Sequence, residues 1–484
     1  MIIEIHEHNE VYLRVMAEKS AFQELQDKFT LDIPGARFMP AYRFGWDGKI
    51  RLLERNGLIY KGLFKEILRF AQSRGYEISY PPSLDPLEFS IQDALDAIGK
   101  LTTLTKTPRD YQVEAMVEVI KNSRLLLISP TASGKSLIIY LLFRFYNLKT
   151  LLIVPTTSLV DQMADDFLEY GYGFPVHKIF SGQEKDTQEA CTISTWQSIY
   201  KLPKEWFDKY EMVIVDEAHL AKASSLKMIM EKLTDCAIRI GTTGTLDGTN
   251  TNEMVLTGLF GPKFQVTTTA ELIEKKTLAK TKIVSICFKY PKEQRAWLAK
   301  SIAQIDDKRN KYKAEVEYLE NHPGRNRFIR NLACKAEGNT LLLFGHVAYG
   351  KEIYQEIKAK TDRPVYLVYG KVSGEERNEI RKIVEKEKEA IIIASFKTFS
   401  TGINITSLNN IILSLVGKAK INLLQSIGRG LRKNETKNSV TIYDLGDDLS
   451  HGKRKSFSLV HMVERLKIYA EEKHKFKIHN VEIT

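Results

Sequence analysis

Short runs in which every position is apolar recur along most of the chain, and each ends abruptly in small or polar residues. A strand with one solvent-exposed face would alternate apolar and polar positions, so these runs predict strands buried on both faces. Stretches of helical character, such as 137–146 and 374–387, lie between them. Strands that alternate with helices form parallel sheets, and ligands bind beyond the carboxyl ends of such strands. The predicted strands are residues 125–128, 151–154, 212–215, 341–344, 391–394 and 411–413.

This pattern divides the chain into five segments. We interpret residues 97–285 and 323–447 as two α/β lobes, because the strand and helix signals alternate only there. The charged stretch 286–322 interrupts the alternation and is predicted to be a helical connection. Residues 1–95 mix short alternating stretches with helical ones and predict a small α+β domain. Residues 448–484 predict a basic helical extension.

Two further features refine these boundaries. Prolines at positions 81, 82 and 86 mark a linker after the N-terminal domain. In the extension, the helix predicted at 459–470 is expected to pack on the second lobe. Lys453, Arg454 and Lys455 either contact phosphates or form a solvated loop.

Composition limits the classes of protein to which the chain can belong. Its 484 residues carry 71 Lys and Arg against 60 Asp and Glu, and this net charge of +11 suits a phosphate-rich partner. No apolar stretch approaches the roughly 18 residues of a membrane span, and the N-terminus does not resemble a signal peptide. We expect a soluble, cytoplasmic monomer that binds no membrane. The cysteines lie too far apart for a zinc ribbon and indicate buried thiols in a reducing compartment: Cys191, Cys236, Cys287 and Cys334.

A phosphate-binding turn is predicted directly after the strand at 125–128. Small residues allow the backbone to curl so that its N–H groups face an anion, and the following helix adds its dipole. Lys135 would reach the β and γ phosphates, and the Ser136 hydroxyl would bind Mg²⁺. The alternative is an ordinary turn, and Ser129 does replace the first glycine of the common pattern. The remaining residues of the turn are Pro130, Thr131, Ala132, Ser133 and Gly134.

An acidic pair follows the predicted strand 212–215 at its carboxyl end. Asp216 would hold the Mg²⁺ through water, and Glu217 would orient and deprotonate the attacking water. His219 would link hydrolysis to the rest of the molecule. A solvated acidic loop is the alternative for this segment when it is taken alone.

Two arginines in the second lobe complete the predicted catalytic set. Arg429 and Arg432 lie three positions apart and therefore share one face of a helix, after Gln425. Surface charge is the ordinary interpretation of such residues. Directed across a cleft, the guanidinium groups would instead stabilise the charge of phosphoryl transfer.

In this order, these segments resemble the motifs of superfamily 2 helicases of the DEAH type, from about residue 108 to residue 435. The resemblance implies two RecA-like parallel-sheet lobes of the P-loop NTPase class, with ATP and Mg²⁺ as cofactors. It implies that Gln112, beside Arg109, contacts the adenine. Gly402 and Asn404 match a further nucleotide-contacting motif, although Asn404 stands where an acidic residue is common.

The same resemblance extends to motifs that contact nucleic acid. Residues 241–245 take the place of the motif that couples hydrolysis to movement. Gln425 differs from the His that is common in the RNA-directed DEAD-box group. The residues expected to face the nucleic acid are Pro155, Thr156, Thr157, Thr195, Trp196, Gln197, His346, Ser400 and Thr401.

A narrower resemblance connects nearly the whole chain with the UvsW recombination helicases of tailed phages. It rests on residues 44–51, on residues 203–207 and on the overall length. It implies an N-terminal domain that helps to grip duplex DNA. It also implies activity on branched DNA, namely fork regression, Holliday-junction branch migration, and removal of R-loops, which contain an RNA–DNA hybrid, and D-loops. A phage protein of this kind would act in the host cytoplasm.

The N-terminal segment around Trp46 is both basic and aromatic. Arg43, Trp46, Lys49 and Arg51 are candidates for contacts with phosphates and with a base or sugar face. The alternative is a β-hairpin that turns at Asp47 and Gly48, with Trp46 in a small core, and such a hairpin could still present the basic residues.

Three other functions compete with a DNA helicase. One is an RNA-directed helicase, and another is an ATP-gated switch that binds duplex without separating its strands. A restriction-type motor would need a nuclease domain, and the sequence has no supporting pattern of acidic residues and lysine.

Overall fold

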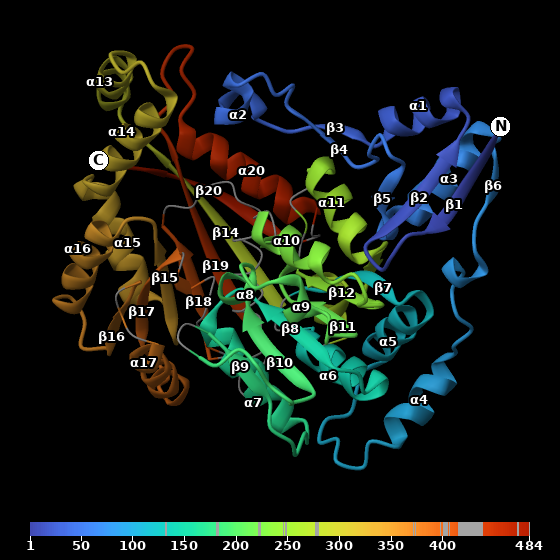
Figure 1. Ribbon diagram of the computed structural model, residues 1–484. Coiled ribbons are helices and arrows are strands. Elements are labelled where there is room, and N and C mark those ends of the chain that lie inside the picture. Colours follow the sequence, from blue (N-terminus) through green and yellow to red (C-terminus); the bar gives the residue numbers. More distant parts are fainter. Residues whose placement is uncertain are drawn as a thin grey trace. The chain divides into compact units, whose positions relative to one another are not determined.

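The computed structural model describes residues 1–130, 133–180, 183–220, 224–244, 246, 249–275, 280–370, 372, 374–396, 398–399, 405, 407–414, 439–471 and 474–483. The chain forms two compact units, Met1–Thr267 and Thr268–Thr484, which are coloured in sequence order in Figure 1. Within the described parts, no helix is both long and apolar enough to cross a membrane.

The first unit begins with a four-stranded sheet in the order β5-β2-β1-β6. Strands β1 and β2 and strands β2 and β5 pair antiparallel, whereas β1 and β6 pair parallel. A separate antiparallel pair, β3 and β4, follows helix α1. The elements of this N-terminal region are β1 (Ile2–Glu7), β2 (Tyr12–Ala17), α1 (Lys19–Lys28), β3 (Thr30–Asp32), η1 (Ala36–Phe38), α2 (Pro40–Arg43), β4 (Lys49–Arg51), β5 (Leu58–Tyr60), η2 (Lys61–Leu63), α3 (Phe64–Arg74) and β6 (Glu77–Ser79).

After a connection that holds η3 (Pro82–Leu84) and α4 (Ile91–Gly99), the chain forms the first lobe. Its seven strands are all parallel and lie in the order β13-β7-β12-β11-β8-β10-β9. The strands are β7 (Arg124–Ile128), β8 (Thr150–Val154), β9 (His177–Ile179), β10 (Cys191–Thr195), β11 (Met212–Val215), β12 (Ile238–Thr243) and β13 (Lys263–Gln265). The helices are α5 (Asp110–Asn122), α6 (Lys135–Tyr146), α7 (Thr157–Glu169), α8 (Trp196–Ile199), α9 (Lys204–Phe207), η4 (Ala218–Leu220), α10 (Ser224–Lys232) and α11 (Asn250–Phe260).

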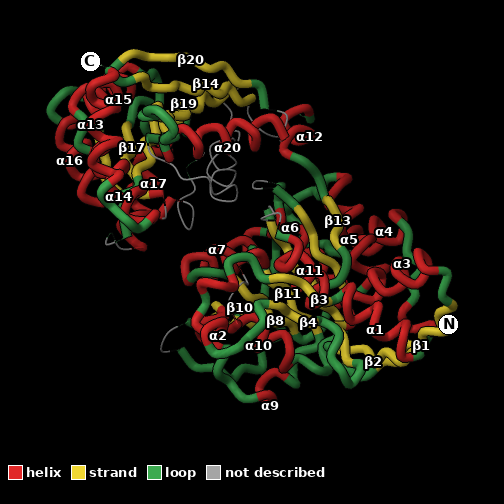
Figure 2. The backbone as a smooth tube through the Cα atoms, turned by 90° about the horizontal axis from the view of Figure 1, so that it is seen from above, coloured by secondary structure: helices red, strands yellow, loops and turns green. Residues whose placement is uncertain are grey.

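The predicted strands of this lobe are confirmed, and the central ones are buried along their length. Helices cover both faces of the sheet, so no face is left for alternating polar residues (Figure 2). Cys191, Cys236 and Cys287 are buried free thiols, as expected, whereas Cys334 is only half-buried.

The N-terminal region is joined to the first lobe by a continuous apolar core. Ile3, Leu13 and Ile67 of the N-terminal region belong to the same buried cluster as Met230 and Phe260 of the lobe. Tight backbone packing reinforces this contact, because a Cβ at Gly62 would lie only 2.2 Å from the carbonyl oxygen of Thr257 on α11. The region therefore folds onto the lobe and is not a flexibly tethered module.

The second unit is built on another parallel seven-stranded sheet, in the order β16-β17-β15-β18-β19-β14-β20. Its strands are β14 (Lys280–Lys289), β15 (Thr340–Phe344), β16 (Val365–Val368), β17 (Ile391–Ser395), β18 (Asn410–Leu413), β19 (Ser439–Asp448) and β20 (Phe476–Glu482). Its helices are α12 (Thr269–Glu274), α13 (Lys292–Ala303), α14 (Lys308–Glu320), α15 (Pro323–Lys335), α16 (Val347–Lys358), α17 (Gly374–Lys386) and α20 (Phe457–Glu471). The strands predicted at 341–344, 391–394 and 411–413 are confirmed.

The structure corrects the expected division of the chain at two places. The boundary at residue 285 falls inside β14, all of whose paired residues lie on β19 and β20 of the second sheet. The segment 448–484 is not only helical, because it contributes β20 to that sheet. Neither strand is a fully apolar run, so the pattern that identified the central strands did not detect them.

The helix predicted at 459–470 is α20, and it packs on β19 through a buried ion pair. Arg465 Nη2 lies 2.7 Å from Asp444 Oδ1, and the Tyr469 hydroxyl donates to Asp444 Oδ2 at 2.9 Å. Arg454 is mostly buried and pairs with Glu315 of α14, which makes it a structural residue of this unit.

Candidate active site

The sheet order of the first lobe brings three chemically distinct loops together. Strands β7, β12 and β11 are neighbours, with Ile128 paired to Thr243 and Val215 paired to Gly241 near their carboxyl ends. The turn after β7, the end of β12 and the acidic segment after β11 therefore meet at one edge of the sheet.

The turn predicted to bind phosphate is held by its own hydroxyl groups. The hydroxyls of Ser129 and Ser133 are 2.6 Å apart, and Ser133 also donates to the Pro130 carbonyl at 2.7 Å. Gly134 has a φ of 82°, and a Cβ there would lie 2.4 Å from Gln112 Nε2, so only glycine fits. Thr131 and Ala132, which complete the predicted turn, lie outside the described residues.

Lys135 is the first residue of α6 and is held by contacts that a phosphate could replace. Its ammonium lies 3.3 Å from Glu217 Oε1 and 3.4 Å from the Ser129 carbonyl oxygen. The Lys135 and Glu217 side chains are 13% and 17% exposed, so solvent and small ligands reach the pair.

Two hydrogen bonds connect the acidic segment with β12. Thr242 donates to Asp216 Oδ1 at 2.6 Å, and the Thr243 hydroxyl lies 2.7 Å from Nδ1 of His219. The other ring nitrogen of His219, Nε2, is buried and has no hydrogen-bond partner among the described residues. An unpaired buried nitrogen is costly, and Nε2 therefore remains available to a further hydrogen-bond partner.

The two carboxylates of this segment have opposite pKa shifts. Burial, together with the charge of Glu217, raises the pKa of Asp216. Burial also acts to raise the pKa of Glu217, but the Lys135 ammonium and His219 outweigh it and hold that pKa well below its usual range. Glu217 is therefore ionised at neutral pH, which a proton acceptor requires.

The backbone of Glu217 is strained. Its φ is 51°, in the left-handed region that costs a non-glycine residue about 1–2 kcal/mol. Strain of this kind is retained where the surrounding structure imposes it, which is common at functional sites. Here the conformation carries the side chain to within reach of Lys135.

The structure places Gln112 and Ser136 differently from the simplest expectation. Gln112 is buried, and its amide donates to the carbonyl oxygens of Ser133 and Gly134, both at 3.1 Å, so its donors are used to clamp the turn. An adenine contact would require these bonds to rearrange. The Ser136 hydroxyl lies 2.8 Å from that of Tyr170, a residue that no pattern in the sequence indicated. Tyr111 also donates to the Ser133 carbonyl at 2.9 Å.

The side chains at this edge fit a nucleotide with a magnesium ion. The ammonium of Lys135 suits phosphate, and the hydroxyl of Ser136 with the carboxylate of Asp216 supplies the oxygen ligands that Mg²⁺ prefers. The unpaired Nε2 of His219 and the strained Glu217 lie in the same segment as Asp216.

Of the residues predicted to face nucleic acid in this lobe, only some are accessible. Thr157 and Gln197 are exposed, and Pro155 and Thr156 are half-buried. Trp196 belongs to the hydrophobic core, and Thr195 is buried with its hydroxyl 2.9 Å from that of Ser198. The prediction that Thr195 and Trp196 face nucleic acid is therefore corrected: both side chains are buried at the start of α8, the short helix that presents Gln197.

In the second unit, His346 is exposed and lies 2.8 Å from Glu320 through Nδ1. The other predicted residues of this unit lie outside the described part of the chain: Ser400, Thr401, Gly402, Asn404, Gln425, Arg429 and Arg432.

The basic segment of the N-terminal region differs from the hairpin considered above. Strand β4 pairs with β3, and Asp47 and Gly48 precede β4 instead of forming the turn between two strands. Trp46 is half-buried and donates through Nε1 to the Lys49 carbonyl at 3.0 Å. Arg43 and Lys49 are exposed, whereas Arg51 pairs with Asp47 at 2.5 Å.

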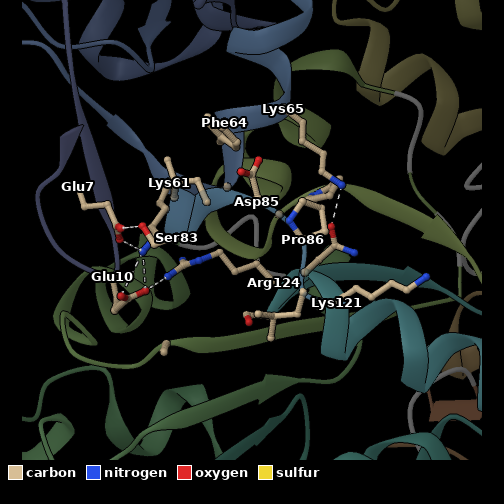
Figure 3. A pocket seen from close by; sticks show the side chains of 18 residues that line it. Glu7, Glu10, Lys61, Phe64, Lys65, Ser83, Asp85, Pro86, Lys121 and Arg124 are labelled. Atoms are coloured by element: carbon tan, nitrogen blue, oxygen red, sulfur yellow. Dashed lines mark hydrogen bonds and ion pairs between the residues drawn. The ribbon is translucent and has the colours of Figure 1, made fainter. Parts of the chain in front are cut away.

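The junction of the N-terminal region with the first lobe contains polar contacts that the sequence did not indicate. The hydroxyls of Tyr12 and Tyr60 donate to Glu231 Oε1 on α10, at 3.1 and 2.6 Å. Figure 3 shows a second group beside a cavity of about 250 Å³, where Lys61 contacts Glu7 and Glu10 and Arg124 contacts Glu10. Each acidic group has a partner more than 50 residues away, so only the fold could reveal the cluster.

The predicted phosphate-binding turn, the acidic pair at the next strand but one and two parallel seven-stranded sheets are typical of nucleotide-hydrolysing motors of the helicase class. Models of protein families agree. Residues 2–81 match "DNA helicase UvsW, N-terminal", residues 105–248 match "Type III restriction enzyme, res subunit", and residues 324–434 match "Helicase conserved C-terminal domain".

Comparisons with individual proteins identify the family more narrowly. The chain is 36% identical to the ATP-dependent DNA helicase uvsW of Enterobacteria phage T4, over all of both chains. It is 25% identical to the DNA 3'-5' translocase XPB2 of Sulfurisphaera tokodaii, over 68% of this chain and 79% of that protein. The crystal structure of T4 UvsW has a TM-score of 0.52 and 35% identity, with complete coverage of both chains. The chain belongs to the UvsW family of ATP-dependent DNA helicases.

A more distant structure shows the shared fold alone. The ATP-dependent type ISP restriction-modification enzyme LlaBIII bound to DNA has a TM-score of 0.56 at 14% identity. That match covers 78% of this chain and 32% of the restriction enzyme.

Proposed function

We propose that this helicase acts on branched DNA, by fork regression, Holliday-junction branch migration and the dissociation of R-loops and D-loops. The observation that carries the proposal is the continuous core between the N-terminal region and the first lobe. Helicase lobes track the backbone of one strand, whereas a region fixed to a lobe can hold a neighbouring duplex arm. A branched DNA molecule offers a strand for the lobes to track and a neighbouring duplex arm at the same time.

Hydrolysis begins with the exchange of partners at Lys135. An arriving phosphate draws the ammonium away from Glu217, which lies 3.3 Å from it before the exchange. Glu217 then loses the cation that holds its pKa low and becomes a stronger base toward the attacking water. Gln112 and Tyr111 keep the turn in shape through their bonds to the Ser133 and Gly134 carbonyls.

Magnesium would be held by Ser136 and Asp216, and when bound it neutralises charge on the phosphates. The Asp216 carboxylate is oriented for this role by Thr242. The bond between His219 and Thr243 connects the same loop to β12, so a change at the acidic segment reaches a second strand. In this scheme the exposed Thr157, Gln197, Arg43 and Lys49 contact the DNA backbone without reading its sequence.

The test compares substrates at equal concentration and constant salt. Full-length protein is incubated with a fork, a Holliday junction, an R-loop, a blunt DNA duplex and an RNA duplex, with and without ATP, and products are resolved on gels. Glu217→Gln is the control for products that do not depend on hydrolysis. The proposal expects ATP-dependent products from the branched DNA molecules and no more than background from the RNA duplex.

Other outcomes would favour the alternatives. Efficient separation of the RNA duplex would indicate an RNA-directed helicase. ATP-dependent binding without strand separation on any substrate would indicate a duplex-binding switch. Light scattering during the reaction would test whether a monomer is sufficient.

A further inference from the structure

The loop between β3 and β4, residues 33–48, displays large apolar side chains to solvent. Phe38 is 93% exposed and Phe44 is 88% exposed, and Met39 and Tyr42 beside them are also exposed. Figure 1 shows the β3–β4 ribbon running out from α1 to the short helix α2, which this loop contains. Grouped apolar side chains that the fold leaves uncovered indicate a contact with another molecule.

The loop is ordered by its own hydrogen bonds, so the exposed rings have fixed positions. Ile33 donates to the Gly48 carbonyl at 2.9 Å and closes the loop at its base, where the Trp46 indole also bonds to Lys49. A Cβ at Gly48 would lie 2.9 Å from the Cβ of Ala36, which shows how closely the two sides of the loop approach.

The base of the loop is attached to the motor lobe. The Thr251 hydroxyl, on α11, donates to the carbonyl oxygen of Asp32 in β3 at 2.8 Å. Leu31 and Ile50, on the paired strands, pack against the core shared with that lobe. The exposed end therefore moves with the first lobe as one body.

Charge around the exposed rings favours an anionic partner. Arg37 and Arg43 are exposed next to Phe38 and Phe44, and neither guanidinium has an acidic partner in the described part of the chain. The one carboxylate of the loop, Asp47, is paired with Arg51. Flat apolar rings between free guanidinium groups match bases carried on a phosphate backbone.

We propose that Phe38 and Phe44 stack against unpaired bases at the branch point of the DNA. The interior bases of a duplex are already stacked on both faces, so rings that do not unstack them contact bases only where the stack ends. The inference rests on the proposed function, since a branch supplies such bases beside a duplex arm. The rings would hold the parted strands while the motor lobes advance.

The experiment measures binding to a fork with 2-aminopurine at the branch, to a blunt duplex and to a single strand. The variants are Phe38→Ala, Phe44→Ala and the double change. Phe174→Ala is the matched control, because Phe174 is 72% exposed on the first lobe, outside the loop. Thermal unfolding and ATPase without DNA should be unchanged in all of them, because the rings are outside the core and the nucleotide site.

Loss of one stacked base weakens binding by roughly 5- to 150-fold. We expect losses in this range for the fork and a smaller loss for the blunt duplex. The unmodified protein should change the 2-aminopurine fluorescence of the fork when it binds, and the double variant should change it less. Phe44→Trp should retain binding, whereas Phe44→Leu, which keeps the apolar character without an aromatic face, should not.

Fork binding by the double variant equal to that of Phe174→Ala would overturn the inference. Equal rescue by Leu and Trp would also overturn it, because apolar packing against another macromolecule would then explain the exposure. If the unmodified protein prefers branched DNA and the variants do as well, only this inference fails. If the unmodified protein shows no such preference, the proposed function fails as well.

Discussion

Two ion pairs, one in each unit, join the first turn of a helix to the carboxyl end of a parallel strand. In the first unit, Lys135 of α6 meets Glu217 after β11 at 3.3 Å, and both side chains are partly accessible. In the second unit, Arg325 of α15 meets Asp447 of β19 at 2.8 Å, and both side chains are 0% exposed. Their chemistry is similar, but their surroundings differ.

The difference lies in how many hydrogen-bond partners the chain gives each pair, although Arg325 Nη1 is itself buried without a partner among the described residues. Asp447 also accepts from Tyr290 at 2.7 Å and from Ser458 at 3.0 Å, and Arg325 also donates to the Ser414 carbonyl. Such a pair stabilises one arrangement and leaves no room for a ligand. Lys135 and Glu217 have fewer partners and lie beside the unpaired Nε2 of His219, so a substrate can replace their contacts.

The largest effect is expected for Glu217→Gln, which keeps the shape of the side chain and removes the base. Turnover of ATP with DNA should fall roughly 10²- to 10⁴-fold, while nucleotide and DNA binding persist. Steady-state ATPase and fluorescent-nucleotide titration measure the two quantities. A variant that no longer binds ATP would show that Glu217 has a structural role like that of Asp447.

Next in size is Asp447→Asn, which leaves the buried Arg325 guanidinium without its counter-charge. The free energy of unfolding of the second unit should fall by about 3–5 kcal/mol. Urea denaturation measures it, with Asp448→Asn as the matched control. Asp448 pairs with Lys289 at a more accessible position, so Asp448→Asn should lower the free energy of unfolding by about 1 kcal/mol or less. Equal losses of stability from the two substitutions would contradict the proposed difference between buried and solvent-accessible ion pairs.

A smaller effect on turnover is expected for Lys135→Ala, at roughly 10²- to 10³-fold, the range for loss of one charge-stabilising donor. Stability should change little, because solvent reaches the pair. Lys178→Ala removes a surface pair with Asp161 and is the control for loss of a lysine in the same unit. Near-normal ATPase in a folded Lys135→Ala protein would refute the phosphate-binding role.

The smallest effect is expected at a part-buried hydrogen-bonded contact, where the hydroxyls of Tyr12 and Tyr60 donate to Glu231. Tyr60→Phe removes one hydrogen bond at the junction and should cost about 1 kcal/mol of stability in the first unit, with ATPase unchanged. Tyr80→Phe, whose hydroxyl bonds to Asp85 at an exposed position, should cost less. Calorimetry resolves the difference, and a large loss of ATPase in Tyr60→Phe would instead indicate coupling between the junction and the nucleotide site.

The junction also changes what truncation of the N-terminal region should do. The sequence favours a catalytic core that folds from about residue 97, because the linker prolines precede the motor motifs. The shared core instead predicts that removal exposes apolar surface around Met230 and Phe260. Substitutions at the exposed Phe38 and Phe44 are therefore a cleaner test of DNA recognition than deletion.

The sequence by itself determined the central strands and predicted the chemistry after them. A strand buried on both faces must be apolar at every position, and a phosphate turn needs small residues before a lysine, so both leave a local pattern. Some strands leave weaker patterns because polar residues alternate with the apolar ones or interrupt them. These are the edge strands β9 and β13 of the first sheet, and strands β14 and β20 of the second sheet.

Only the tertiary structure decided which polar groups are satisfied and which are left for a ligand. Gln112 is hydrogen-bonded to the predicted phosphate turn across 21 residues of sequence, and Arg325 donates to Asp447 across 122 residues. Trp196 became core and Phe38 became surface, although both are aromatic residues in basic or polar surroundings. The burial of a side chain and the number of its hydrogen-bond partners depend on segments that meet only in the folded chain. No local pattern of residue types contains that information.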